Sequence, residues 1–211
     1  MNFGGVLRCF VCGNVLKNAG PRNIFAATQS VSNSLEVAKV LAVDVSPPYI
    51  TWAHLTRDKQ ILSWERTKFL DEKSRHHLHS YYSAVQEVLP SLPVADLYVV
   101  EQRPTRQKQS SESLHLRTQL AIQAMLVALL SHGKEHQPQV VSIKSAAVTQ
   151  LFQLNVGNER ISGQETLNGL FESGAIEKGL RTSYLQESSV NREHLCNVLL
   201  LAHAFYLLVE S

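Results

Sequence analysis

Two acidic residues each end an apolar segment of the kind that forms a buried strand. Asp44 follows the run at 40–43, and Glu101 follows the run at 97–100. A carboxylate at the exit of each of two neighbouring parallel strands is an arrangement that holds a divalent metal ion against a phosphate. The pair therefore indicates nucleic-acid chemistry, provided that further ligands complete the site.

The further ligands are expected from the apolar segment at 191–209, where Glu193, His194 and Asn197 are the candidates. His194 and Asn197 have the i, i+3 spacing that places two side chains on one helix face. A two-metal centre needs about three or four carboxylates, but Asn197 is neutral and His194 suits Mg²⁺ poorly. We therefore predict a degraded site, in which the five residues are vestigial, no metal or other cofactor is bound and no residue is catalytic.

Both carboxylates also have ordinary structural explanations. Asp44 can accept a hydrogen bond from Ser46, and Glu101 can pair with Arg103 or Arg106 in the loop that follows it. That loop lies at the carboxyl edge of the predicted sheet, where ligands of α/β proteins bind. The predicted nucleic-acid-binding residues are Arg103, Arg106, Lys108 and Lys144. A merely solvated loop explains the first three equally well.

The elements that must position these residues follow from hydrophobic periodicity. Strands are predicted at 41–45, 49–55, 60–66, 95–101 and 140–143, and helices at 71–89, 113–132, 146–154, 164–174 and 191–209. Three strands in a meander, followed by alternating helices and strands, require a mixed sheet with helices on both faces. This order is that of an α/β, ribonuclease H-like mixed five-stranded sheet. In that fold Asp44 and Glu101 end side by side.

Composition sets broad limits. With 211 residues, 44% apolar and 18% charged, the chain has enough material for one globular domain and an appended tail. A net charge of +2 allows a local phosphate-binding face without requiring one. No uninterrupted apolar stretch reaches about 18 residues, so no membrane partner is expected. Three cysteines argue against a disulfide scaffold, and the lone Cys9-x-x-Cys12 lacks a second pair for zinc.

The first 35 residues contain Arg8, Lys17 and Arg22 but no acidic residue. That profile is typical of a mitochondrial transit peptide, and a disordered or partly packed N-terminal extension is the alternative. The folded domain is predicted to span 36–211.

Several histidines invite a metal-site interpretation that their spacing does not favour. His76, His77 and His79 are too close in sequence to converge from one helix, so a solvated helix face is expected. His203 lies deep in an apolar helix and is predicted to be a core histidine with its hydrogen bonds satisfied.

Several blocks, in order, resemble one family. Residues 49–55 (Y-I-T-W-A-H-L) with 61–64 (I-L-S-W) look like the I-A-W-A-H-L hairpin of the mitochondrial transcription elongation factor. Further similar blocks are A-D-L-Y-V-V-E at 95–101, the segment 112–130 with A-M-L-V-A-L-L at 124–130, V-S-I at 141–143, V-G-N-E-R-I-S-G at 156–163 and A-F-Y at 204–206. The resemblance covers about 35–210.

The resemblance implies the carboxy-terminal pseudonuclease domain of that factor, whose fold is of the Holliday-junction resolvase type. Such a domain binds the mitochondrial RNA polymerase, DNA and RNA–DNA hybrid, forms a homodimer and promotes transcription elongation in the nucleoid of the mitochondrial matrix. The family's preceding helix-hairpin-helix module has no room here, so we expect a shortened member or a partial chain. The dimer interface is expected on the terminal helix or on the helix at 113–132.

Two alternatives remain open at this point. An active Holliday-junction resolvase would use Asp44, Glu101, His194 and either Glu193 or Asn197 with Mg²⁺ or Mn²⁺. Against it, the resolvase D-x-x-D pattern fails at both His194 and Asn197. A dimeric interaction module that never touches DNA is the other alternative.

Overall fold

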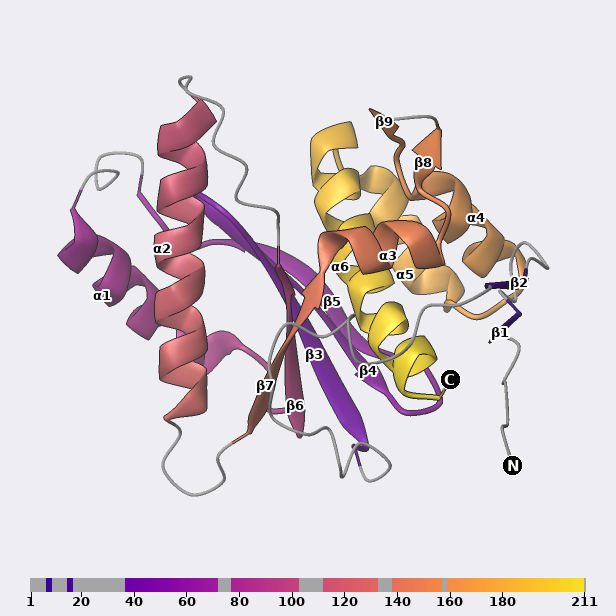
Figure 1. Ribbon diagram of the computed structural model, residues 1–211, viewed down its shortest axis with the longest axis horizontal. Coiled ribbons are helices and arrows are strands. Elements are labelled where there is room, and N and C mark those ends of the chain that lie inside the picture. The colour runs from indigo at the N-terminus through magenta and orange to yellow at the C-terminus, as the bar shows by residue number, and fades with distance from the viewer. Residues whose placement is uncertain are drawn as a thin grey trace.

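A mixed five-stranded sheet forms the centre of the computed structural model (Figure 1). The structure describes residues 7–8, 15–16, 37–71, 77–102, 112–132, 138–156 and 159–210. The sheet has the order β5-β4-β3-β6-β7, and its strands are β3 (Lys39–Ser46), β4 (Tyr49–Thr56), β5 (Ile61–Lys68), β6 (Leu97–Gln102) and β7 (Gln139–Lys144). The first three form an antiparallel meander, whereas β3, β6 and β7 pair in parallel. The predicted strand order is confirmed.

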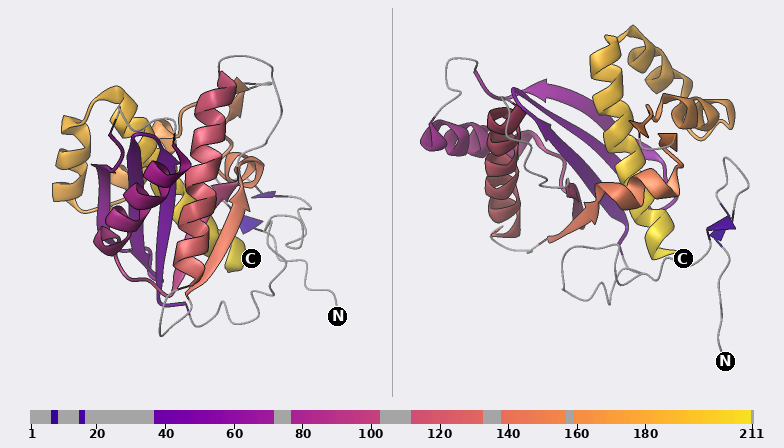
Figure 2. Two further views of the ribbon diagram at one scale, coloured as in Figure 1. Left: turned by 90° about the vertical axis from the view of Figure 1, so that its left-hand side faces the viewer. Right: turned by 45° about the horizontal axis from the view of Figure 1, so that its top comes forward.

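Helices cover both faces of this sheet (Figures 1 and 2). One layer contains α1 (Leu78–Val88), the short η4 (Leu89–Ser91) and α2 (Glu112–Ser131). The other contains α3 (Ser145–Leu151), α4 (Gln164–Glu172), α5 (Lys178–Gln186) and α6 (Ser189–Val209). Two small hairpins add β1 (Leu7–Arg8) with β2 (Val15–Leu16), and β8 (Asn155–Val156) with β9 (Glu159–Arg160).

Strand β3 is apolar on both faces because it lies at the centre of the sheet. Val40 and Ala42 belong to the core under α6, whereas Leu41 and Val43 belong to the core under α1 and α2. Alternation of side chains along a strand assigns these residues to opposite faces. The same parity places Asp44 on the α6 face.

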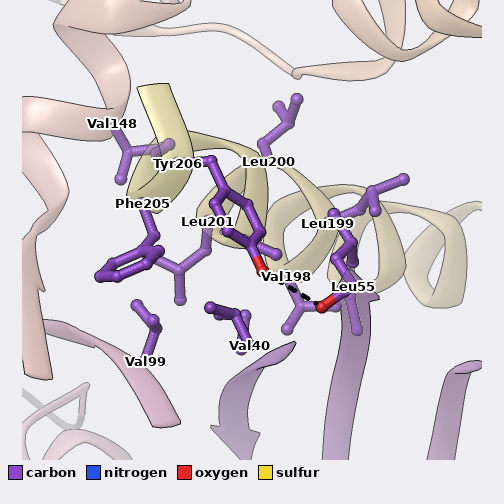
Figure 3. Packing of buried hydrophobic residues seen from close by; sticks show 14 of the residues in the cluster. Val40, Leu55, Val99, Val148, Val198, Leu199, Leu200, Leu201, Phe205 and Tyr206 are labelled. Atoms are coloured by element: carbon purple, nitrogen blue, oxygen red, sulfur yellow. Dashed lines mark hydrogen bonds between the residues drawn. The ribbon is translucent and has the colours of Figure 1, made fainter. Parts of the chain in front are cut away.

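Helix α6 fills one of the two cores. Its apolar side chains from Val198 to Tyr206 are buried in the core that also contains Val40 and Val99 of the sheet and Val148 of α3 (Figure 3). Near its end the Tyr206 hydroxyl donates to the Leu55 carbonyl at 3.3 Å. One residue past the helix, Glu210 pairs with Lys59 of the β4–β5 turn at 2.9 Å. These contacts hold the C-terminal end of α6 at the end of the sheet where β3 begins.

Some element boundaries differ from prediction. Helix α5 was not predicted, because Lys178–Gln186 carries few apolar residues and a glycine in its first turn. The predicted helix at 146–154 ends at Leu151, and the helix predicted at 164–174 ends at Glu172. The helix predicted from 71 begins, within the described residues, at Leu78. The β8–β9 hairpin was also missed.

The histidine predictions fare differently. His203 is buried as predicted, with 6% of its surface exposed. However, in the described part of the chain its Nε2 has no hydrogen-bond partner, so the prediction of satisfied hydrogen bonds is wrong. Burial, with a smaller contribution from Lys59, lowers the pKa of His203 to about 4. His77 and His79 are exposed at the start of α1, whereas His76 lies outside the described residues, as do Cys9 and Cys12.

Candidate nucleic-acid site at the carboxyl edge of the sheet

Asp44 and Glu101 follow the last paired residues of two adjacent parallel strands. The register joins Val43 to Val100, so the two acidic residues come next on β3 and β6. Both share the α6 face with Ala42 and Val99, and they are 6% and 8% exposed. The strand order predicted this juxtaposition, and adjacent strands lie about 4.8 Å apart.

Asp44 contacts a hydroxyl and an imidazole. The Ser46 hydroxyl donates to its Oδ2 at 3.1 Å, which is the structural role expected from the sequence. The same oxygen lies 3.4 Å from Nδ1 of His194 on α6. Helix α6 begins at this edge, where the Ser188 hydroxyl accepts from the Asn191 amide. One turn later, His194 reaches the end of β3.

The other two candidate ligands from α6 are Glu193 and Asn197. Glu193 accepts hydrogen bonds from Ser162 at 2.6 Å and from Gln164 at 3.4 Å, so it is bound to the start of α4 and the residues before it. Asn197 follows His194 by three residues on α6 and is half-buried. Glu101 is buried on β6, and its backbone carbonyl accepts from Gln123 of α2 at 2.9 Å.

This donor set does not fit a two-metal nuclease centre. Two carboxylates, one imidazole and one neutral amide supply less negative charge than two hard cations need. Within the described ranges, no three His, Cys, Asp or Glu side chains gather closely enough to hold a metal ion. We therefore derive no hydrolytic step from these residues.

The predicted nucleic-acid-binding residues are divided by the structure. Arg103, Arg106 and Lys108 lie outside the described residues. Lys144 ends β7, opposite Gln102 of β6. Its side chain lines a cavity of about 700 Å³ beside α2, so it shares the edge with the carboxylates but lies on the other face of the sheet. The sequence did not reveal this, because the faces of β7 depend on its parity relative to β6.

Sequence reasoning missed a second group of polar residues on the α6 face of the sheet, the face that holds Asp44 and Glu101. Register pairs Asp44 with Thr51 of β4, and Thr51 with Arg66 of β5. The three residues form a row across the sheet, and the guanidinium carbon of Arg66 lies 3.9 Å from the ring centroid of Tyr49. No short motif marks this group. Counting the register of the predicted meander was the only signal that could have found it.

Comparison with known proteins gives relatives of one name. No family model matches the chain. It is 29% identical over 195 residues to the zebrafish (Danio rerio) protein named mitochondrial transcription elongation factor, covering 83% of this chain and 53% of that protein. It is 31% identical over 173 residues to the Bos taurus protein of that name, covering 74% and 48%. The chain thus spans about half the length of these relatives, and the resemblance expected from the sequence is confirmed.

Solved structures agree with the predicted fold class. The yeast mitochondrial Holliday junction resolvase Ydc2 superposes with a TM-score of 0.57 at 12% identity, over 80% of this chain and 78% of that one. RuvC of Thermus thermophilus, in complex with a Holliday junction substrate, gives 0.52 at 12% identity, over 82% and 94%. At such identity the likeness shows the fold alone, which is ribonuclease H-like.

Proposed function

We propose that this chain, a relative of the mitochondrial transcription elongation factors, is a non-catalytic factor that binds nucleic acid and the mitochondrial RNA polymerase. It would promote transcription elongation in the nucleoid of the mitochondrial matrix. The observation that carries the proposal is the pairing of Asp44 with His194 at 3.4 Å, where a nuclease needs a further carboxylate. The names of the relatives and the resolvase-like fold support it.

Active resolution of Holliday junctions is the second candidate. Asp44 and Glu101 favour it, because both carboxylates stand side by side at the edge where a phosphate would be cut. The shortage of negative charge on α6 argues against it.

We also propose that the functional unit is a homodimer formed through α2. Of the two helices expected to form the interface, α6 is covered, because its side chains from Val198 to Tyr206 are all buried within one protomer. Helix α2 is long and apolar enough to cross a membrane by length and composition alone, yet only 22% of its residues from Leu114 to Ser131 are buried. Apolar surface of this kind marks an interface.

The groove beside α2 suits a second copy. Leu120, Ala124 and Val127 of α2 form its apolar wall, and Ser142 and Lys144 of β7 form the opposite side. Strand β7 is also the last strand of the five-stranded sheet, and an edge strand can pair with a strand of another chain. A self-complementary contact would cover both features in each protomer.

A combined binding and cleavage assay tests the proposed function. Labelled four-way junction, duplex and RNA–DNA hybrid are incubated with Mn²⁺ and either wild type, Asp44→Asn or the control Asp58→Asn, which makes the same change in an exposed turn at the opposite edge. We expect all three to bind equally and none to cleave. Cleavage that Asp44→Asn alone abolishes would establish the resolvase. Capture of purified mitochondrial RNA polymerase tests the partner.

A further inference from the structure

On the α6 face of the sheet, β4 and β5 carry buried polar groups that have no hydrogen-bond partner among the described residues. Thr51 has none of its surface exposed, yet within the described residues its hydroxyl has no hydrogen-bond partner. The Nε of Arg66 is buried and lacks a partner in the same way. Buried polar groups are nearly always hydrogen-bonded, so such a pair calls for an explanation, and an absent ligand is one.

The guanidinium of Arg66 is held in a fixed orientation. It stacks on Tyr49, which lies two residues before Thr51 on the same face of β4. A cation on an aromatic face is stabilised without neutralising its charge. A planar guanidinium fixed in this way presents paired N–H donors with the geometry that phosphate accepts.

A second arginine is close in the fold. Trp64 precedes Arg66 by two residues on β5, and its Nε1 donates to the Leu195 carbonyl of α6 at 2.9 Å. Arg192 lies one turn before Leu195, and its Nε is also buried without a partner among the described residues. A second arginine therefore lies one helical turn from the residue that Trp64 contacts.

We propose that Arg66, supported by Tyr49 and Thr51, binds a phosphodiester group of a nucleic-acid strand that passes beside Asp44. The inference deepens the proposed function and rests on it. Asp44 and Glu101 repel a phosphate at this end of the sheet wherever no cation offsets their charge. Arg66 lies on β5, two β-strands away from Asp44 on β3, and its charge attracts the nucleic acid. The nucleic acid would therefore be held beside the two carboxylates and not across them.

Salt-dependent binding tests this directly. Anisotropy of a labelled duplex and of an RNA–DNA hybrid is measured from about 50 to about 300 mM NaCl. We expect Arg66→Gln to weaken binding about tenfold at low salt and to lower the log–log salt slope by about 0.9, the value of one phosphate contact. Arg66→Lys should keep the slope and recover part of the affinity, since it retains the charge but loses the planar fork.

The matched control is Arg181→Gln. Arg181 also lies over an aromatic ring, that of Phe171 at 5.5 Å, but on the exposed surface of α5. The Arg181→Gln variant should bind the duplex and the hybrid as wild type does. Tyr49→Leu retains both arginines and should weaken binding about threefold. This variant and Arg66→Lys keep the test decisive if Arg66→Gln fails to fold.

The outcomes separate the two proposals. Wild type that binds no nucleic acid would overturn both. Wild type that binds, with Arg66→Gln equal to Arg181→Gln in affinity and slope, would overturn only the assignment of Arg66. Inorganic phosphate, added at constant ionic strength, should not displace the duplex at low millimolar concentration; displacement that Arg66→Gln abolishes would identify free phosphate as the ligand and overturn the assignment.

Discussion

The imidazole Nδ1 of His194 lies 3.4 Å from Oδ2 of Asp44, although 150 residues separate the two in the chain. When protonated, His194 offsets the charge of Asp44 without an added ion. The side chain of Asp44 is 7% exposed and that of His194 is 23% exposed, so water reaches the pair mainly from the histidine side. The contact gives Asp44 a partner from within the chain.

Restoring carboxylates on α6 should create a metal site. His194→Asp combined with Asn197→Asp adds two acidic groups to the face that already holds Asp44 and Glu101. We expect Mn²⁺ to raise the Tm of this variant by several degrees, because a ligand that binds only the folded state stabilises it. Thermal unfolding with Mn²⁺ and with EDTA measures the shift.

The control for that experiment carries the same spacing elsewhere. Ser183→Asp with Gln186→Asp places two carboxylates three residues apart on exposed positions of α5. Neither this variant nor wild type should respond to Mn²⁺. An equal response in the two double variants would contradict the site.

Stability should fall as the pH falls, because of His203. Its pKa is about 4 in the folded protein and near 6.5 when unfolded, mainly through burial. The folded state favours the neutral imidazole, so this contribution is complete above about pH 6.5 and is lost as the pH falls toward 4. Its size is roughly 3 kcal/mol. Urea unfolding across this range measures it.

His203→Leu should flatten that dependence, whereas His79→Leu, on the exposed face of α1, should leave it unchanged. Part of the slope should persist in His203→Leu, since burial also lowers the pKa of His54. An identical slope in wild type and His203→Leu would exclude His203 as the source.

Gly163→Ala should destabilise the packing between α4 and α6. A Cβ at this position would clash with Cδ1 of Leu200 and lie 3.1 Å from Sγ of Cys196, both in the core. We expect a loss of about 1–3 kcal/mol in the free energy of unfolding. Gly179→Ala, within α5, meets nothing within 4 Å and should be neutral or stabilising by up to about 1 kcal/mol. Denaturant unfolding of the two variants compares them.

The proposed dimer should depend on α2. Ala124→Arg places a charge on the apolar wall of the groove and should yield monomers in light scattering after size exclusion. Leu185→Arg changes an apolar residue that is 51% exposed on α5, beyond the opposite face of the sheet, and should leave the mass unchanged. A monomeric wild type, or a dimeric Ala124→Arg, would argue against this interface.

Sequence alone located the carboxylates well because the relevant patterns are strong. Apolar runs end at Asp44 and Glu101, and the order of elements makes their strands neighbours. The helical spacing likewise brought His194 into consideration, and the structure places it against Asp44. Each of these inferences depends on a period or an order that one sequence contains.

The remainder depends on relationships between distant elements. Lys144 could not be assigned to the α2 face, because register between β6 and β7 decides its side. Arg66 and Thr51 become neighbours of the site only through two antiparallel registers. Helix α5 has too little apolar periodicity to be recognised; its buried residue, Tyr184, stacks on Trp64 with ring centroids 5.1 Å apart.

The ion pair between Lys59 and Glu210 fixes the position of the C-terminal end of α6, which makes this end a suitable site for a fluorescent label. It anchors the end of α6 at the amino end of β3, whereas Asp44 lies near the other end of this eight-residue strand. The five residue steps from Lys39 to Asp44, at about 3.3 Å each, make a separation of roughly 17 Å along the strand. A dye coupled just after Glu210 would therefore remain clear of the nucleic-acid edge, yet within range for energy transfer to a labelled strand bound there.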